Sequence, residues 1–278
     1  MIFEAGLAEE VKKFEELPEV VVTATRTEIP VEAAPASVNV VTKEKIEMKK
    51  PKTIDEALND ISGVMVRRGK GLMDTLAFIT LRGIPEQKRT LLMLDGITLN
   101  NPYFGGVRLG GFFPEDLEKV EVVKGPFSSL WGGYAMGGVV QFITKMPEKR
   151  EITIKTGYGS SFDRGEAMDD LRRVYLSYGD KIGKFSFFLS YGRHDTNGYV
   201  TDFATYNRWW DDGITIKAQY EFNEKTRLRL TYLRNRYEYN YDEPHPYLYN
   251  ATTNQPVYYP SQKDYLPGPG GRIQNIWG

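Results

Sequence analysis

The sequence predicts an α+β domain followed by antiparallel strands of the transmembrane β-barrel type. Up to about residue 150, short β-branched runs alternate with short helical segments, which favours a small sheet covered by helices. Beyond that point, apolar and polar residues alternate with a period of two, as in strands with one wet face. Sixteen of the eighteen tyrosines also lie beyond residue 150, so the two halves differ in composition.

The bulk composition excludes several classes of protein. The 278 residues suffice for one large or two ordinary domains, and 41% hydrophobic residues with 26% charged residues indicate a packed core. A net charge of -1 gives no basic field that would recruit nucleic acid. Cysteine is absent and the two histidines, His194 and His245, lie far apart. We therefore predict no disulfide, no metal site and no cofactor.

The first half predicts a small mixed sheet with short helices. Thr53 and Glu56 form a capping-box pattern that opens a helix over residues 54–60, and Gly63 can end this helix. Strands are predicted at residues 18–25, 37–42, 64–67, 76–81, 91–94, 120–124 and 139–144, with a turn at Asp95-Gly96.

The second half predicts about five strands of 9–11 residues each, the length that a tilted transmembrane strand needs. Tight turns are expected at residues 179–183 and 223–224, and long loops at 159–171, 195–211 and after Tyr239. Short turns at one end and long loops at the other are typical of an outer-membrane barrel. The alternating stretches are residues 152–158, 174–178, 185–192, 214–222 and 228–232.

A water-soluble β-sandwich is the alternative, because its strands alternate in the same way. Lys217, Gln219 and Glu221 share one face of their strand, opposite an unbroken apolar face. This arrangement favours a polar interior and a lipid-facing exterior over the sandwich.

Motifs between residues 57 and 145 are more specific than the periodicity. They are ALNDISGV at 57–64, LRG at 81–83, LLMLDGITLNNP at 91–102 and VEVVKGPFSSLWGGYAMGGVVQFITK at 120–145. In order and spacing, these motifs resemble the plug domain of TonB-dependent receptors, and the resemblance covers about residues 19–240. The stretch VVVTA at residues 20–24 resembles the TonB box of that family.

The resemblance implies a plug domain enclosed by a 22-stranded β-barrel. It divides the chain into an N-terminal extension (1–17), the TonB box and linker (18–30), the plug (31–147) and the first five or so barrel strands (148–278). An open barrel edge in lipid is untenable, so we expect the chain to be a fragment. Residues 1–10 lack the features of a signal peptide, so we also expect the signal, or the natural start, to be missing.

The family resemblance implies active uptake of a scarce chelate, of the ferric siderophore, cobalamin or haem class, without catalysis. The implied partners are TonB, the chelate as ligand and the lipid of the outer membrane, with the plug facing the periplasm and a monomer when full length. A soluble β-rich binding or adhesion module is the alternative function. An enzyme is a third class, but the sequence holds no distinctive acid/base or nucleophile constellation.

The resemblance assigns the TonB box to a β-branched peptide, which suits pairing with TonB as an added strand. An ordinary edge strand of the plug is the alternative for the same residues. The predicted box consists of Val20, Val21, Val22, Thr23 and Ala24.

Two basic residues match positions that hold the plug to the barrel in the family, where arginines pair with barrel glutamates. Arg82 matches the first position, but Lys124 stands where the second arginine is expected. Lysine lacks the bidentate fork of arginine, so a solvated lysine remains the alternative at Lys124. We expect the partner glutamates to lie beyond Gly278.

Ligand contacts are expected on two apical loops of the plug, about residues 67–75 and 100–111. Cationic and aromatic side chains there could meet an anionic or aromatic chelate, although each could equally belong to a solvated loop. The candidates are Arg68, Lys70, Tyr103, Phe104 and Arg108.

Overall fold

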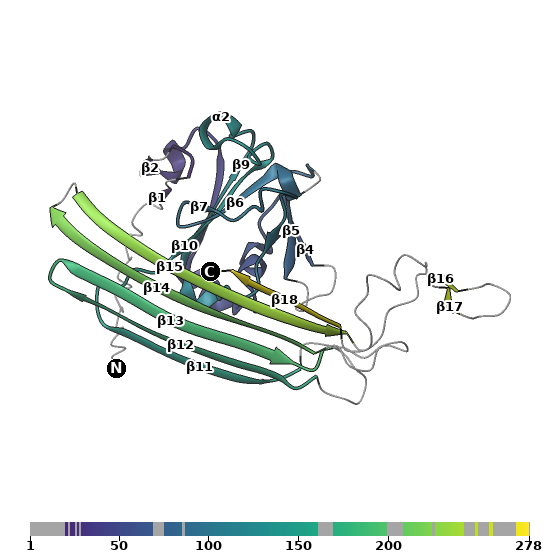
Figure 1. Cartoon of the computed structure of the whole chain (residues 1–278). Helices are drawn as coiled ribbons and strands as arrows, with labels where there is room; N and C mark the ends of the chain where they lie inside the picture. The colour runs from purple at the N-terminus through teal and green to yellow at the C-terminus, as the bar shows by residue number, and fades with distance from the viewer. Residues whose placement is uncertain are drawn as a thin grey trace, which may run out of the picture.

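Two β structures lie face to face in the computed structural model of this chain (Figure 1). An N-terminal domain with short helices sits against one face of a long antiparallel sheet. The structure describes residues 20–21, 23–25, 27, 29–68, 75–84, 87–160, 169–198, 208–223, 226–241, 248–249, 256–257 and 271–277.

The N-terminal domain is built on a five-stranded sheet in the order β3-β9-β10-β6-β7. β10 runs parallel to β6, and the other neighbours are antiparallel. All five residues of β6 are buried, as its continuous apolar sequence predicts for a central strand. The strands are β3 (Ser37–Thr42), β6 (Thr90–Leu94), β7 (Ile97–Thr98), β9 (Leu117–Lys124) and β10 (Gly138–Thr144).

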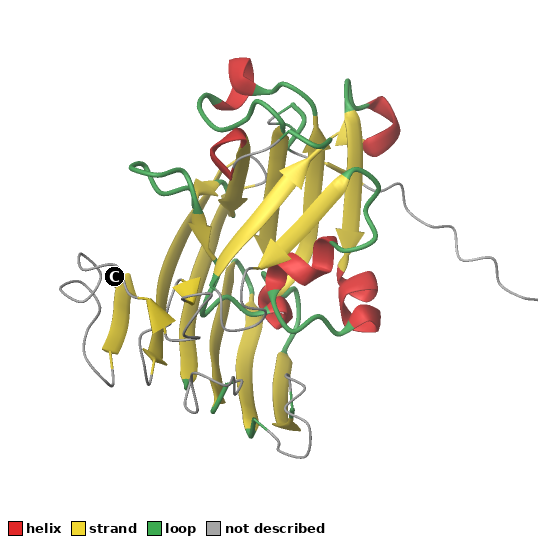
Figure 2. Cartoon of the chain, turned by 90° about the vertical axis from the view of Figure 1, so that its right-hand side faces the viewer, coloured by secondary structure: helices red, strands yellow, loops and turns green. Residues whose placement is uncertain are grey.

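Smaller elements surround this sheet. A three-stranded sheet, β4-β5-β8, and a two-stranded ribbon, β1-β2, accompany the short helices, which all belong to the N-terminal domain in the described residues (Figure 2). The strands are β1 (Val20–Val21), β2 (Ile29–Pro30), β4 (Val64–Arg68), β5 (Leu76–Leu81) and β8 (Val107–Arg108). The α-helices are α1 (Lys43–Lys49) and α2 (Ser128–Trp131), and 3-10 helices cover Val31–Ala33, Ile54–Leu58, Gln87–Arg89 and Pro114–Asp116.

The predicted helix over residues 54–60 is a shorter 3-10 helix, Ile54–Leu58. The predicted capping box is wrong, because Thr53 makes no side-chain cap hydrogen bond. Glu56 instead accepts a hydrogen bond of 2.6 Å from the backbone N–H of Lys52. The helix ends before Gly63 because burial of its apolar residues in the domain core, rather than local capping, fixes this turn.

The long sheet contains six antiparallel strands in chain order. They are β11 (Glu151–Gly159), β12 (Leu171–Ile182), β13 (Phe185–Thr196), β14 (Trp209–Asn223), β15 (Thr226–Tyr241) and β18 (Gly271–Trp277). A ribbon of two paired strands, β16 (Leu248–Tyr249) and β17 (Pro256–Val257), lies apart from it. The sixth strand, β18, was not among the five predicted, since its seven residues are too few for a clear alternation.

The predicted strand lengths are too short for β12 to β15, which hold 12, 12, 15 and 16 residues. Strand pairing continues beyond the apolar stretches into segments with polar residues. For example, Asp195 of β13 pairs with Trp210 of β14. The tight turn between β12 and β13 also lies later than predicted, at Gly183-Lys184, with Gly183 at a φ of 61°. Gly179 and Asp180 are paired within the ladder instead.

The two faces of the long sheet have the polarity predicted for a membrane barrel rather than a sandwich. One face points away from the N-terminal domain and leaves large apolar side chains exposed. The inward face carries polar side chains that are buried against the domain, such as Ser186, Thr215 and Lys217. The exposed outward residues include Ile152, Ile154, Leu176, Tyr178, Leu189, Ile216, Tyr220, Leu228, Leu230 and Tyr232.

No helix among the described ranges is both long enough and apolar enough to cross a membrane.

Candidate functional site

The predicted TonB box is docked on the N-terminal domain. Val21 and Thr23 are fully buried and Ala24 is 3% exposed, while Val22 lies outside the described residues. Val20–Val21 form a ribbon with Ile29–Pro30 and do not extend the five-stranded sheet. Val21 and Ala24 pack with Val123 of β9 in a small apolar cluster. The strand predicted at residues 18–25 is therefore limited to β1 in the described residues.

Polar contacts hold this segment in place through Thr23. Its backbone N–H and its hydroxyl donate to Oε2 of Glu121 at 2.9 Å and 2.6 Å. The indole N–H of Trp131 donates to the carbonyl oxygen of Thr23 at 2.9 Å. We call Thr23, Glu121 and Trp131 the segment clasp.

Glu121 is charged within this clasp although its side chain is buried. Burial by itself raises the pKa of a carboxyl group, but hydrogen bonds from Lys119 and Thr23 outweigh it and lower the pKa of Glu121. Lys119 Nζ lies 2.8 Å from Oε1 of Glu121. The clasp is therefore a charge-assisted contact, the stronger kind of hydrogen bond.

Arg82 and Lys124, the two predicted latch residues, meet at one corner of the domain. The backbone N–H of Arg82 donates to the carbonyl oxygen of Gly63 at 2.8 Å, and Lys124 Nζ donates to that of Ser62 at 2.9 Å. The exposed Arg82 side chain has no ion pair within the described part of the chain. The two cations are thus positioned together, and a carboxylate partner for them stays a prediction.

Two of the predicted ligand residues, Phe104 and Arg108, line one cavity of about 430 Å³ between the apical loop and β15. The guanidinium carbon of Arg108 lies 5.7 Å from the ring centroid of Tyr237, which also lines the cavity. Tyr103 is on the same loop and 97% exposed, but it does not line the cavity. Lys70 lies outside the described residues.

Arg68 is engaged elsewhere, in a buried ion pair with Asp55. Its Nε and Nη2 donate to the two carboxylate oxygens at 2.9 Å and 2.5 Å. Burial alone would lower the pKa of Arg68, but the charge and hydrogen bonds of Asp55 raise it. The structure thus ties Arg68 to the 3-10 helix Ile54–Leu58 and does not place it in the cavity.

Polar contacts that were not predicted from the sequence fix the N-terminal domain to the inward face of the long sheet. Lys217 Nζ lies 3.0 Å from Oδ2 of Asp95 and donates to Thr144 Oγ1 at 2.6 Å. Arg173 Nη2 donates to both carboxylate oxygens of Glu115 at 2.9 Å and 2.6 Å. These pairs join residues far apart in sequence, so no local pattern reveals them.

Asp116 is a second buried contact point. The hydroxyls of Tyr175 and Thr215 donate to its two oxygens at 2.6 Å and 2.9 Å. Burial raises the pKa of Asp116, although hydrogen bonds from Tyr175, Ser190 and Thr215 oppose the rise. The carboxyl group therefore titrates at a higher pH than an exposed aspartate.

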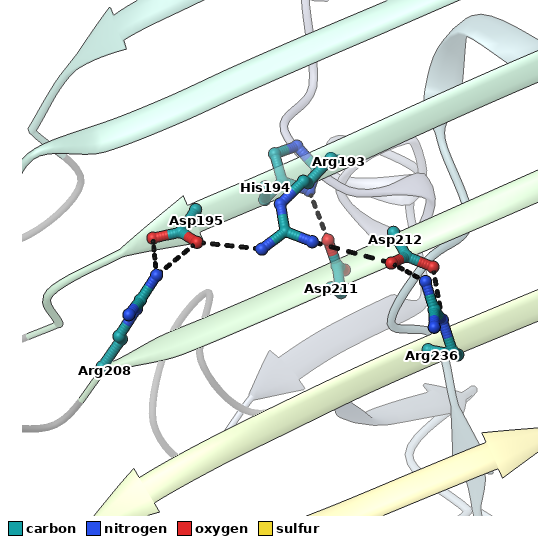
Figure 3. A network of polar contacts seen from close by, with 7 residues as sticks. All are labelled: Arg193, His194, Asp195, Arg208, Asp211, Asp212 and Arg236. Atoms are coloured by element: carbon teal, nitrogen blue, oxygen red, sulfur yellow. Dashed lines mark hydrogen bonds and ion pairs between the residues drawn. The ribbon is translucent and has the colours of Figure 1, made fainter.

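A notch of two glycines on the inward face receives Phe113. Gly192 and Gly213 are paired across β13 and β14, and a Cβ on Gly192 would lie 2.5 Å from the Phe113 ring. The ring stacks on His194 with centroids 4.9 Å apart. Beside it, His194 Nδ1 lies 2.9 Å from Oδ1 of Asp211 (Figure 3), whose Oδ2 accepts the N–H of Gly111 at 2.7 Å.

Adding a methyl group at this notch should displace the loop that carries Phe113. A Cβ on Gly213 would lie 1.9 Å from the carbonyl oxygen of Gly111, so backbone must move. We expect Gly213→Ala to destabilise docking by about 1–3 kcal/mol, the usual cost of overpacking. Thermal unfolding of the purified protein should show a lower Tm, whereas Gly159→Ala, with no atom within 4 Å of the added Cβ, should leave it unchanged. Equal melting of the two variants would contradict this account.

Comparison with known proteins identifies the N-terminal domain. Residues 30–139 match the family model described as the TonB-dependent receptor plug domain. Residues 30–139 of the chain belong to the TonB-dependent receptor plug domain family. The prediction made from the motifs is thereby confirmed, and so is the prediction of a plug followed by antiparallel strands.

Curated relatives of this chain include transporters. The ferrichrome outer membrane transporter/phage receptor of Escherichia coli K12 is 31% identical over 162 residues, covering 53% of this chain and 20% of that protein. The vitamin B12 transporter BtuB of Vibrio vulnificus is 37% identical over 145 residues, covering 51% of this chain and 23% of that protein. The chain thus spans about a fifth to a quarter of the length of these relatives. It is an outer-membrane protein of the Gram-negative type, as predicted.

Solved structures share the fold of this receptor. The pyoverdine outer membrane receptor FpvA of Pseudomonas aeruginosa matches with a TM-score of 0.63 at 18% identity, covering 86% of this chain and 33% of that one. The siderophore receptor PirA of Acinetobacter baumannii matches with a TM-score of 0.57 at 18% identity, covering 73% and 32%. At this identity, the likeness establishes the fold of the plug and strands alone.

Proposed function

We propose that this receptor supports TonB-dependent uptake of a scarce chelate, of the ferric siderophore, cobalamin or haem class, across the outer membrane. The proposal rests on the observation that the Val-rich segment and the rest of the plug are anchored by separate sets of contacts. The Val-rich segment is held by a small clasp, whereas the plug is fixed to the inward face of the strands by several buried polar pairs. A pull on the segment can therefore free it before the plug leaves the strands.

The cavity beside the apical loop is the proposed place of first contact with the chelate. Phe104 and Tyr237 offer aromatic surfaces, and Arg108 offers a cation that is 5.7 Å from the Tyr237 ring centroid. Such a lining suits an anionic or aromatic ligand. The names of the relatives, which include ferrichrome and vitamin B12 transporters, support the same class of cargo.

The segment of residues 20–24 is the proposed coupling site. Once released from the clasp, its backbone groups can pair with a strand of TonB by β-augmentation. Arg82 and Lys124, gathered at one corner, are the proposed latch to barrel carboxylates. No step needs bond chemistry, so the proposal implies no enzyme activity.

Deletion of residues 20–24 separates binding from transport. In the receptor expressed from its own gene, we expect cellular uptake of the cargo to fall to background while ligand binding to outer membranes is unchanged. Radiolabelled ferric siderophores, cobalamin and haem are the three arms of the assay, and Thr27→Ala, an exposed change outside the deletion, is the control. Undiminished uptake of a bound ligand would refute the coupling role.

A further inference from the structure

A second cavity lies between the plug and the first two strands of the long sheet. Its volume of about 640 Å³ falls within the range of ~300–1,000 Å³ that is usual for small-molecule sites. α1 and Pro114–Glu115 line it from the plug, and residues 153–157 of β11 with Arg173 of β12 line it from the sheet. Among the described residues, none lines both this cavity and the one beside the apical loop, so the two are separate places.

Cationic side chains outnumber carboxylates around this second cavity. The carboxylates are Glu47 and Glu115. Glu115 serves two cations at once, because it lies 2.6 Å from Arg173 Nη2 and 3.5 Å from Lys155 Nζ. The cavity therefore keeps an excess of positive charge. Its five cations are Lys43, Lys50, Lys145, Lys155 and Arg173.

Lys145 is a buried cation of this lining that lacks an ionic partner. The residue is 7% exposed, and its ammonium group makes no ion pair or hydrogen bond within the described part of the chain. Its backbone N–H donates to the carbonyl oxygen of Asp116 at 2.8 Å, which fixes its position beside the cavity. Burial, together with the charge of Lys43, lowers the pKa of Lys145. A buried charge without a partner costs free energy, and a bound anion offsets that cost.

We propose that this cavity binds a small polyanion, whose acidic groups are carboxylates or phosphates, with Lys145 as its central contact and Lys43 beside it. Thr153 of β11 supplies a hydroxyl donor on the opposite wall. A ligand in this place contacts the plug on one side and the first strand on the other, so it strengthens the docking of the plug. The inference rests on the lining of this cavity and does not depend on the cargo that is taken up.

Citrate and inorganic phosphate are the two probes, added to the receptor purified from outer membranes in mild detergent and compared with chloride at matched ionic strength. Titration calorimetry should show binding of at least one of them, and the tighter of the two identifies the acidic group. We expect Lys145→Met to weaken this binding at least about ten-fold, because a charge-assisted contact is lost. Lys45→Met is the matched control, since Lys45 is an exposed lysine of α1 that does not line the cavity. It should bind as the parent does.

Thermal unfolding separates a ligand contact from a merely structural lysine. In chloride alone, Lys145→Met should unfold at no lower temperature than the parent, because methionine removes a buried charge that has no partner. The bound anion should raise the Tm of the parent and of Lys45→Met, as a ligand of the folded state does, and leave that of Lys145→Met unchanged.

Acetylation of lysines, followed by mass spectrometry, locates the bound anion. The anion should protect Lys145 from acetylation and leave the reactivity of Lys45 as it was. Three results would each overturn the proposal. They are binding of both probes no stronger than that of chloride, equal binding by Lys145→Met, and a lower Tm of Lys145→Met in chloride alone.

Discussion

Replacing Lys217 by methionine is expected to loosen the plug from the strands by about 3–5 kcal/mol, the usual effect of removing one partner of a buried ion pair. The Lys217 side chain is 1% exposed and that of Asp95 is 5% exposed, so water cannot take over the lost contact. Methionine keeps the length of the side chain, and the effect therefore comes from the carboxylate of Asp95, which is left buried without its cation.

Hydrogen exchange measures this loosening at the right place. Amides of β6 and β10, which flank Asp95 and Thr144, should exchange about 100-fold faster or more in the variant. The double variant Asp95→Asn, Lys217→Met removes the stranded charge and keeps an acceptor for Thr144, so most of the protection should return. If the double variant exchanges as fast as Lys217→Met alone, the buried charge is not the cause.

Glu121→Gln should raise the population of the undocked TonB-box segment about ten-fold, since a hydrogen bond to a charged group contributes about 1.5–3 kcal/mol and glutamine keeps part of it. The substitution conserves the shape of the side chain and removes the charge that receives both the N–H and the hydroxyl of Thr23. The chain contains no cysteine, so Thr27→Cys provides a single site for a spin label at an exposed position three residues after the segment.

The mobility of that label is the measurement, and Glu118→Gln, an exposed change on the same strand, is the control. Because the hydrogen bonds from Thr23 lower the pKa of Glu121 and exist only in the docked state, their contribution is complete above the ordinary carboxyl pKa. It is lost as the pH falls through the lowered pKa. The label should therefore become mobile on acidification in the parent protein and depend less on pH in Glu121→Gln. An immobile label throughout would contradict the clasp.

The sequence predicted the elements whose pattern is local. The alternation of Ile214, Ile216 and Tyr220 with Thr215, Lys217 and Gln219 gave both the strand β14 and the correct outward and inward faces. Asp95-Gly96 forms the predicted turn, with both residues at positive φ between β6 and β7. These signals need only the side-chain period of a strand and the backbone preference of a turn.

Contacts made in three dimensions could not be predicted in the same way. Thr53 looked like a helix cap, but core packing of Ile54 and Leu58 decided the geometry. Arg68 looked like a ligand contact because nothing local marks Asp55 as its partner. The helix α1 (Lys43–Lys49) was missed as well, since its single buried residue, Ile46, gives almost no helical period.

The candidate site was predicted in part for the same reason. Motif order placed Phe104 and Arg108 on an apical loop, and the structure brings them to one cavity. The order of the motifs could not show that Thr23 lies against Glu121, because 98 residues separate the two in the sequence.

Phe113 fits between Gly192 and Gly213 because neither glycine has a side chain to fill the space. A recess of this kind tolerates no independent change: a larger residue at either glycine requires a smaller one at position 113, or a rerouted loop. The three positions should therefore vary together among homologous receptors. Because the Phe113 ring fits only into this recess, the plug can dock on the strands in only one orientation.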